Sequence, residues 1–267
     1  MKLTLRTDPA VPLEAEAISP AALAGLSASE VARLPVLHGN REVELGEFFA
    51  VEGAWDGTLR LEGDLSGVKL IGAGMSEGHV IVDGHVGAHL GAEMTGGEIR
   101  VEGDAGDWVG REMSGGRIVI KGNAGHLVGA ATRGSAVGIR GGEIFIHGSA
   151  RNELGNGMRR GLIAVGGDSG DFAGVNMLAG TIIVLGRIGA RPGAGMKRGT
   201  IASMNEAELL PTFTYACVLE PLFLRLYLLH LRALGLPVDE SQARGRYRRW
   251  SGDSVELNRG EILLLER

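Results

Sequence analysis

The chain has 267 residues, of which 44% are apolar and only 4% aromatic, so it can bury a sizeable core that must be aliphatic. Glycine is unusually frequent: 45 of the 267 residues are glycine, about 17%, where about 7% is usual. No Gly-X-Y period is present, which excludes a collagen triple helix. The net charge of −5 argues against nucleic acid as a partner, and a single cysteine excludes an intrachain disulfide and disfavours a zinc or iron–sulfur site.

Residues 1–56 lie outside any repeat, and we expect them to form an N-terminal lead-in or cap. The alternation in Met1–Arg6 predicts a strand, and Pro20, just after a capping serine, predicts the start of short helical turns that extend to Leu34. The N-terminus lacks the apolar region of a signal peptide, and no apolar run is long enough to cross a bilayer. We therefore expect a cytoplasmic protein without a membrane partner.

A glycine-marked repeat occupies residues 57–203. Each copy has a short strand with alternating apolar residues between two glycines, as in Gly97-Glu-Ile-Arg-Val-Glu-Gly103. The copies begin 19 residues apart, except for one interval of 21 and one of 26, which contains a seven-residue insertion at Ala131–Val137. They start at Gly57, Gly78, Gly97, Gly116, Gly142, Gly161, Gly180 and Gly199. One face of each strand is therefore apolar.

Stacking is the way for such short strands to bury their apolar faces, with rungs about 4.8 Å apart and glycine at the corners. A methionine recurs at one position per coil, which predicts a stacked core column rather than metal ligands. These residues are Met75, Met94, Met113, Met158, Met177 and Met196. Left-handed hexapeptide helices need a period that is a multiple of six, and 19 is not. We therefore predict an all-β solenoid, a right-handed parallel β-helix.

Residues 204–267 leave the repeat, and we expect a helical segment and a tail that pack on the solenoid or on a partner. Phe213–Leu234 is apolar almost all round and is followed by Gly235 and Pro237, which predicts a helix that ends there. A helix that is apolar on all sides is buried on more than one. One side can lie on the β-helix, and a partner subunit is the natural cover for the other.

No motif in the chain indicates catalysis. The glycine pattern at Gly72-Ala-Gly74 resembles a nucleotide-binding loop, but it recurs along the repeat without a following helix, so we interpret it as a corner. His85 and His89 have the spacing of a zinc-binding HExxH motif but lack its glutamate. We therefore expect no catalytic residue and no metal site on this chain.

The two halves of the repeat carry opposite charge. Residues 57–115 hold four basic and ten acidic side chains, whereas residues 116–199 hold eleven and four. Distance along the sequence becomes distance along the axis of a solenoid, so we expect an electric dipole. Basic residues at or near equivalent positions after the methionine site form a candidate binding edge: Arg133, Arg140, Arg159, Arg160, Lys197 and Arg198. Two interpretations stay open, a solvated edge or a groove for a polyanion or an acidic partner surface.

The repeat consensus, intact in Gly96–Met113, resembles the glycine-rich β-helix shared by the C subunit of formylmethanofuran dehydrogenase and the C-terminal domain of the glutamate synthase large subunit. The flanks are similar to those of the dehydrogenase C subunit. They are Leu34-Pro-Val, Gly39-Asn40 and Leu45-Gly-Glu-Phe-Phe49 before the repeat, and Arg248-Arg-Trp-Ser-Gly-Asp253 and Gly260-Glu-Ile262 after it. The resemblance therefore covers essentially the whole chain.

This resemblance implies a non-catalytic scaffold subunit of a bacterial formyltransferase/hydrolase complex in the one-carbon metabolism of methylotrophs. Such a complex moves a formyl group from formyl-tetrahydromethanopterin to a methanofuran-type carrier and then hydrolyses it to formate. The implied partners are an amidohydrolase-like hydrolase, a formyltransferase and a dehydrogenase-like subunit, with any zinc on the hydrolase. The carrier's polyglutamate tail would give the basic edge an anionic ligand.

Two alternatives stay open. The first is the C subunit of an archaeal-type formylmethanofuran dehydrogenase, which fixes CO2 with molybdenum or tungsten pterin and iron–sulfur groups on other subunits. The second is a free-standing glutamate-synthase-like β-helix domain. The low-lysine composition, rich in Ala, Arg and Gly, favours the bacterial complex.

Overall fold

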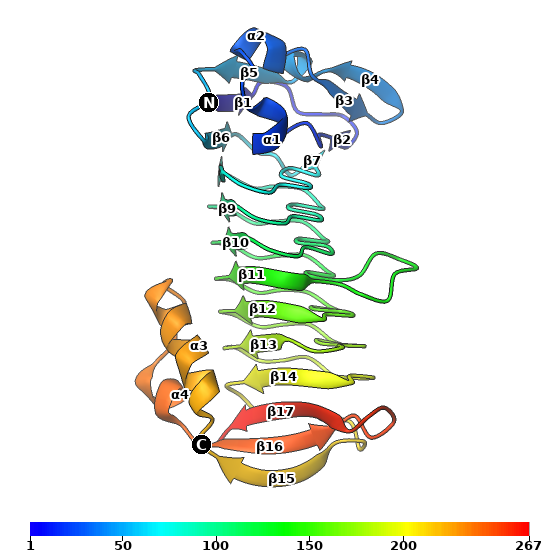
Figure 1. Ribbon diagram of the computed structural model, residues 1–267, viewed down its shortest axis with the longest axis vertical. Helices are drawn as coiled ribbons and strands as arrows, with labels where there is room; N and C mark the ends of the chain where they lie inside the picture. The colour runs from blue at the N-terminus through cyan, green and yellow to red at the C-terminus, as the bar shows by residue number, and fades with distance from the viewer. Residues whose placement is uncertain (267) are drawn as a thin grey trace.

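The computed structural model describes residues 1–266, which are mostly β-structure with few helices. A mixed sheet of 13 strands runs the length of the molecule, and a second sheet of four strands lies near its N-terminal end. Figure 1 shows an elongated body in which the strands of the large sheet stack like rungs, with helices α3 and α4 beside its C-terminal half. Within the described residues, no helix is long and apolar enough to cross a bilayer.

The N-terminal segment caps the stack, and one of its strands belongs to the large sheet. β1 (Lys2–Leu5) pairs antiparallel with β5 (Phe49–Glu52) and parallel with β6, so it lies between them. The short helices are α1 (Pro20–Leu23), α2 (Ala28–Val31) and the 3₁₀ turn η1 (Leu45–Glu47). The small sheet contains β2 (Leu13–Glu14), β3 (Pro35–His38), β4 (Arg41–Glu44) and β7 (Val68–Lys69). The helix start predicted at Pro20 is confirmed.

The repeat supplies one parallel rung per copy. The rungs are β6 (Thr58–Glu62), β8 (His79–Asp83), β9 (Glu98–Val101), β10 (Arg117–Ile120), β11 (Arg140–Ile146), β12 (Arg160–Val165), β13 (Thr181–Val184) and β14 (Arg198–Ser203). Their register follows the period, because Ile118 pairs with Ile99 on one side and Ile144 on the other. Equivalent residues of successive copies therefore lie next to each other in space.

A second ladder runs parallel to the first. Single parallel bridges join one residue of each coil to the next, in the order Leu65, Val86, Ala105, Ala124, Ala150, Ser169 and Ile188. These residues are 19 apart, or 26 across the insertion, except for the first interval of 21, and all are buried. Each turn of the chain thus pairs with the next turn along a second line, separate from the rungs.

Inward-facing side chains form continuous aliphatic columns. The six methionines of the predicted core column are all 0% exposed, which confirms their place in the core. In the coil that carries the insertion, Ile139 precedes Arg140 as Met158 precedes Arg159, and it is also fully buried. The insertion leaves the stack as a loop before β11 (Figure 1), so it lengthens one turn without breaking the columns.

Glycine is not the only residue with positive φ at the corners. Three coils have such a residue at Glu93, Glu112 or Asn176, with φ from 54° to 58°. A further position is left-handed without glycine in seven successive coils, with φ between 56° and 66°. These residues are Leu70, His89, Trp108, Leu127, Glu153, Phe172 and Arg191, again at the repeat spacing. The repeat pattern predicted such conformations for glycine alone, so this column is a finding of the structure.

The segment 213–234 differs from the predicted single helix. Thr214–Leu219 is a strand, β15, and only Leu222–Ala233 is helical, as α3. Pro221 separates the two because proline is not tolerated inside a helix, and the residues before it satisfy their backbone groups by pairing antiparallel with β16 (Tyr247–Gly252). β17 (Arg259–Leu265) then adds a last parallel rung to β14.

Helix α3 covers the outer face of the later rungs and forms a second core there. Leu224, Leu228 and Leu231 are fully buried in the same cluster as Phe145 and Ile183, two outward-facing strand residues. The short helix α4 (Glu240–Arg244) adds Ala243 to this cluster. A helix lies here because the outward positions of these rungs are apolar, whereas those of earlier rungs carry charges such as Arg60 and Arg100.

Candidate functional site

An open groove with a volume of about 660 Å³ lies between the edge of the later rungs and helix α3. Three arginines line it: Arg159, Arg160 and Arg198. Between them lies the segment 178–181, which includes Ala179 and Gly180, and Tyr227 contributes from α3. Residues far apart in the sequence thus form one concave surface that is rich in positive charge.

The strand register explains why the arginines gather there. Leu162 of β12 pairs with Thr181 of β13, which pairs with Thr200 of β14. Two residues before these positions come Arg160, Ala179 and Arg198, so a small side chain stands between two long ones. The short Ala179 side chain leaves room between the two guanidinium groups, and this gap belongs to the groove.

The positive charge of the groove is not neutralised within the chain. Among residues 1–266, Arg159, Arg160 and Arg198 are exposed, and no ion pair within 4.0 Å is formed by any of them. Like charges held close together without counter-charges create a local positive potential. Arginine is also the side chain that binds carboxylate or phosphate in a bidentate manner. The groove can therefore hold an anionic group.

The remaining members of the predicted basic edge lie outside this groove. Arg140 Nη2 is 3.8 Å from Glu112 Oε2, and Lys197 Nζ is 3.8 Å from Glu256 Oε2. Arg133 lies on the protruding insertion. All three are exposed, but the first two already face a carboxylate. The structure thus brings three of the six predicted residues into one site.

The α3 wall of the groove has exposed apolar side chains. Leu222 and Leu226 are 72% and 71% exposed, and Phe223 and Tyr227 are 41% and 37% exposed. On a helix, residues four apart lie on one face, so Leu222 and Leu226 form one stripe and Phe223 and Tyr227 the next. The glycine repeat does not predict this wall, because α3 lies outside the repeat. The apolar residues on all sides of the predicted helix did indicate that one of its faces would not be covered by this chain.

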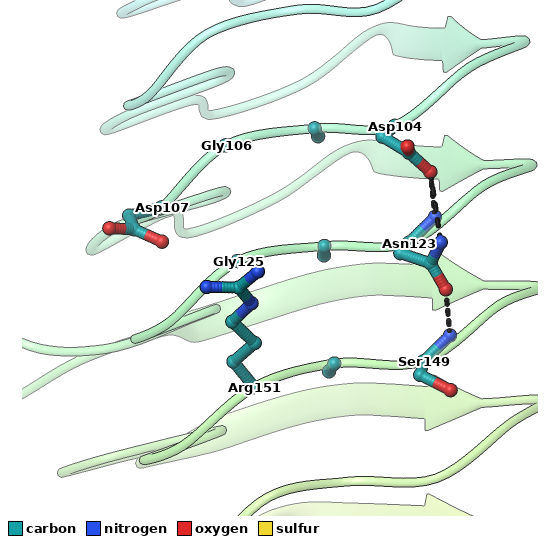
Figure 2. A pocket seen from close by; sticks show the side chains of 10 residues that line it. Asp104, Gly106, Asp107, Asn123, Gly125, Ser149 and Arg151 are labelled. Atoms are coloured by element: carbon teal, nitrogen blue, oxygen red, sulfur yellow. Dashed lines mark hydrogen bonds between the residues drawn. The ribbon is translucent and has the colours of Figure 1, made fainter.

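A second hollow of about 470 Å³ lies over the ladder of single bridges, and Figure 2 shows it from close by. Gly106 and Gly125 lie in its floor, and the Arg151 side chain extends over the coil that carries Gly125. An added Cβ at Gly125 would lie 2.1 Å from Asp107 Oδ1, so the floor needs glycine for close packing of coils.

The Asp104, Asp107 and Asn123 side chains around this hollow hold successive coils together. Asp104 Oδ1 accepts a hydrogen bond from the Asn123 backbone N–H at 2.6 Å, and Asn123 Oδ1 accepts one from the Ser149 N–H at 2.9 Å (Figure 2). A second row of such side-chain hydrogen bonds includes the one that Asp107 Oδ1 accepts from the His126 N–H at 2.7 Å. These acceptors stabilise the stack, so we assign this hollow a structural role.

His85 and His89, the pair with the spacing of a zinc-binding motif, lie in different environments. His85 Nδ1 accepts a hydrogen bond from the Asp104 N–H at 3.0 Å, so it belongs to the same row of side-chain hydrogen bonds as Asp104 and Asn123. His89 stacks on Trp108 with ring centroids 5.9 Å apart, and burial, with Arg111 and Lys69 nearby, lowers its pKa. Within the described residues, no group of three or more metal-ligating side chains gathers.

Comparison with known proteins identifies two kinds of similarity. The family model described as the GXGXG motif matches residues 68–216. The solved structure of the formyltransferase/hydrolase complex (FhcABCD) from Methylorubrum extorquens in complex with methylofuran contains a chain that superposes with a TM-score of 0.92 at 36% identity. That superposition covers 100% of both chains.

Curated relatives match over shorter segments. The C subunit of the molybdenum-containing formylmethanofuran dehydrogenase 1 of Methanothermobacter wolfeii is 46% identical over 90 residues, 33% of this chain and 22% of that protein. The tungsten-containing counterpart of Methanothermobacter thermautotrophicus is 42% identical over 93 residues, 33% of this chain and 34% of that one. The C subunit of the formyltransferase/hydrolase complex of Methylorubrum extorquens is 37% identical over 73 residues, 27% of this chain and 28% of that one. The alignments thus span about a fifth to a third of these relatives.

Proposed function

We infer the function from one premise: the chain belongs to the GXGXG family, among the C subunits of formylmethanofuran dehydrogenases and formyltransferase/hydrolase complexes. We propose that it is the non-catalytic scaffold subunit of a formyltransferase/hydrolase complex. The observation that carries this proposal is the superposition over the full length of both chains at a TM-score of 0.92. It includes the N-terminal cap and the C-terminal tail, which a bare repeat domain would not share.

The proposal also covers the finer description of the fold. The parallel register of the rungs and the second ladder of bridges support a parallel β-helix, and the 19-residue period, which is not a multiple of six, favours the right-handed form. We divide it into an N-terminal cap at residues 1–56, the β-helix at 57–203, and a C-terminal segment at 204–267. The pairing of β1 with β6 and of β17 with β14 supports the view that both flanks close the ends of the stack.

In this proposal the reaction takes place on the other subunits. A hydrolase, a formyltransferase and a dehydrogenase-like subunit would carry the formyl group from formyl-tetrahydromethanopterin to a methanofuran-type carrier and on to formate, with any zinc on the hydrolase. The methylofuran in the related complex supports a carrier of this type. An archaeal-type reductive complex is the second candidate, because the C subunits from Methanothermobacter are 46% and 42% identical over short segments, against 37% for the bacterial C subunit.

The basic edge would serve the same complex by binding an anion. Arg159, Arg160 and Arg198 can bind a polycarboxylate, either the tail of the carrier or the surface of an acidic partner. Arg133 would extend the positive field around the groove, and Arg140 and Lys197 would add less to it because each faces a carboxylate.

Native mass spectrometry of a complex purified through a tag on this chain tests the proposal. We expect the chain to travel with three other subunits in a fixed ratio. We also expect the complex, and not the isolated chain, to transfer and hydrolyse formyl groups. A chain that purifies alone from cells containing the other subunits, or that turns over substrate by itself, would contradict the proposal.

A further inference from the structure

The outward face of α3 is unusual for a helix on a protein surface. Surface helices carry polar residues opposite their buried stripe. In α3 the buried stripe is formed by Leu224, Leu228 and Leu231, and the opposite face carries Leu222 and Leu226 at 72% and 71% exposure. Two neighbouring leucines left in water form an apolar patch, and such patches mark surfaces that bind another protein.

The apolar patch and the arginines belong to one continuous surface. Phe223 and Tyr227 lie one helical step from the leucine stripe, and Tyr227 lines the groove together with the arginines. The surface therefore changes from apolar on the outer side of α3 to cationic at the ends of the rungs, with aromatic side chains between. Its three guanidinium groups have no carboxylate partner among the described residues.

We propose that this surface docks an acidic, amphipathic segment of a partner subunit, with carboxylates on the arginines and apolar side chains on Leu222 and Leu226. The inference rests on the proposed function and names the occupant of its basic groove. Charge complementarity requires the acidic side. A free polyglutamate tail would satisfy the arginines but would leave both leucines in water, whereas a protein segment with two faces covers both.

Competition within the assembled complex tests this docking surface. The wild-type chain and a variant of different mass are co-expressed in equal amounts with the three other subunits from the same organism, and native mass spectrometry gives their ratio in the complex. The variants are the charge reversal Arg159→Glu with Arg160→Glu, and the polar replacement Leu222→Ser with Leu226→Ser. All four side chains are exposed, so both variants should fold, which the circular dichroism of each isolated chain verifies.

Matched controls separate the surface from general effects of charge or polarity. Arg151→Glu reverses an exposed charge in the glycine-floored hollow, and Val255→Ser removes a side chain that is 76% exposed outside the groove. We expect both controls to compete equally with the wild type. We expect each groove variant to be at least tenfold under-represented in the complex, and the charge reversal to lose most at low salt.

Three other results would overturn the inference. Equal incorporation of both groove variants would show that no partner needs this surface. Loss with the arginine variant alone, together with binding of poly-L-glutamate to the isolated wild-type chain, would assign the groove to an anionic tail and leave the scaffold function intact. A wild-type chain that does not assemble with the other subunits at all would overturn the proposed function and this inference together.

Discussion

Glycine at the corners of this molecule both permits positive φ and leaves space for a neighbouring side chain. Two nearby glycines, Gly72 and Gly74, allow these effects on stability to be measured separately. Gly72 and Gly74 both have positive φ, +68° and +65°. An added Cβ at Gly72 would lie 2.6 Å from Ile99 Cδ1, whereas at Gly74 it would meet nothing within 4 Å. Gly74 therefore supplies conformational freedom alone, and Gly72 also makes room for a core side chain from the repeat copy after the next one.

We expect Gly74→Ala to lower the free energy of unfolding by about 1–2 kcal/mol through backbone strain. Gly72→Ala should lower it by about 1–3 kcal/mol more, because Ile99 is fully buried and must shift in a packed core. Urea unfolding of the full chain compares the two variants. Equal losses would mean that the core accommodates the extra methyl group.

The sequence could place these glycines but not the other left-handed residues. The period marks a corner wherever glycine recurs, yet Leu70 and His89 have no compositional signal for positive φ. Their conformation is held by contacts with the next coil, since the Leu70 N–H donates to the Ala88 carbonyl at 3.1 Å and the His89 N–H to the Asp107 carbonyl at 2.8 Å. Such hydrogen bonds depend on stacking, so residue propensity alone does not predict them.

Asp253 makes the stability of the C-terminal end depend on pH. Burial alone would raise the pKa of Asp253, which is 3% exposed, but hydrogen bonds from the Gly195 and Val255 N–H groups outweigh it and hold the pKa below the usual 3.8. The carboxylate is thus stabilising above about pH 3.8, and this contribution disappears as the pH falls through the lowered pKa.

We expect Asp253→Asn to lower the free energy of unfolding at pH 7 by about 1–3 kcal/mol, because hydrogen bonds to a charged acceptor are replaced by weaker ones. The difference between the variant and the wild type should shrink as the pH falls below about 3.8. Thermal unfolding at a series of pH values measures it. A difference that stays constant down to pH 2 would show that the charge has no part in the effect.

At the scale of elements, α3 has two leucine-rich faces with different tasks. Leu228 is fully buried against the rungs, whereas Leu226, two residues earlier, is 71% exposed. Leu228→Ala should cost the isolated chain about 2–4 kcal/mol through lost burial and a cavity, and Leu226→Ala less than about 0.5 kcal/mol. Denaturant unfolding distinguishes them. Similar losses would indicate that the outer face of α3 packs on the same chain.

The sequence correctly indicated that α3 has apolar residues on two faces, but the predicted start of the helix at Phe213 was wrong, because α3 begins at Leu222. The first part of the run, residues 213–219, is a short apolar stretch without a clear period, and such a stretch fits a strand as well as a buried helix. The strand β15 forms because β16, which lies some 30 residues later, offers an antiparallel partner. A partner so distant in the chain is not visible to a local pattern.

At the scale of the whole molecule, the period predicts which residues align along the axis but not what lies beside them. Equivalent positions after the methionine column placed Arg160 and Arg198 on one edge, and the strand register agrees with that alignment. The apolar wall of the groove comes from α3, outside the repeat, so the shape of the candidate site depends on tertiary packing. The gap at Ala179 is likewise apparent only once its stacked neighbours are known.

The insertion offers a test of how independent the coils are. Removing Ala131–Val137 would leave Gly129-Ala130-Gly138-Ile139, which matches Gly155-Asn156-Gly157-Met158 of the next coil. Gly138 could then take the left-handed position that Gly157 occupies with φ +68°. In the intact chain the Ile139 N–H already donates to the Gly129 carbonyl at 2.9 Å, so the ends of the loop lie close together.

We therefore expect the deletion variant to fold with a melting temperature within a few degrees of the wild type, because stacked repeats contact only their neighbours and tolerate such changes in loops. Circular dichroism and thermal unfolding check this. The variant also lacks Arg133, so unchanged incorporation into the complex would confine the binding surface to the groove beside α3. A chain that no longer folds would instead mean that the loop stabilises the stack, for which the Glu112 carboxylate, which accepts a hydrogen bond from the Thr132 N–H at 2.9 Å, is the first contact to test.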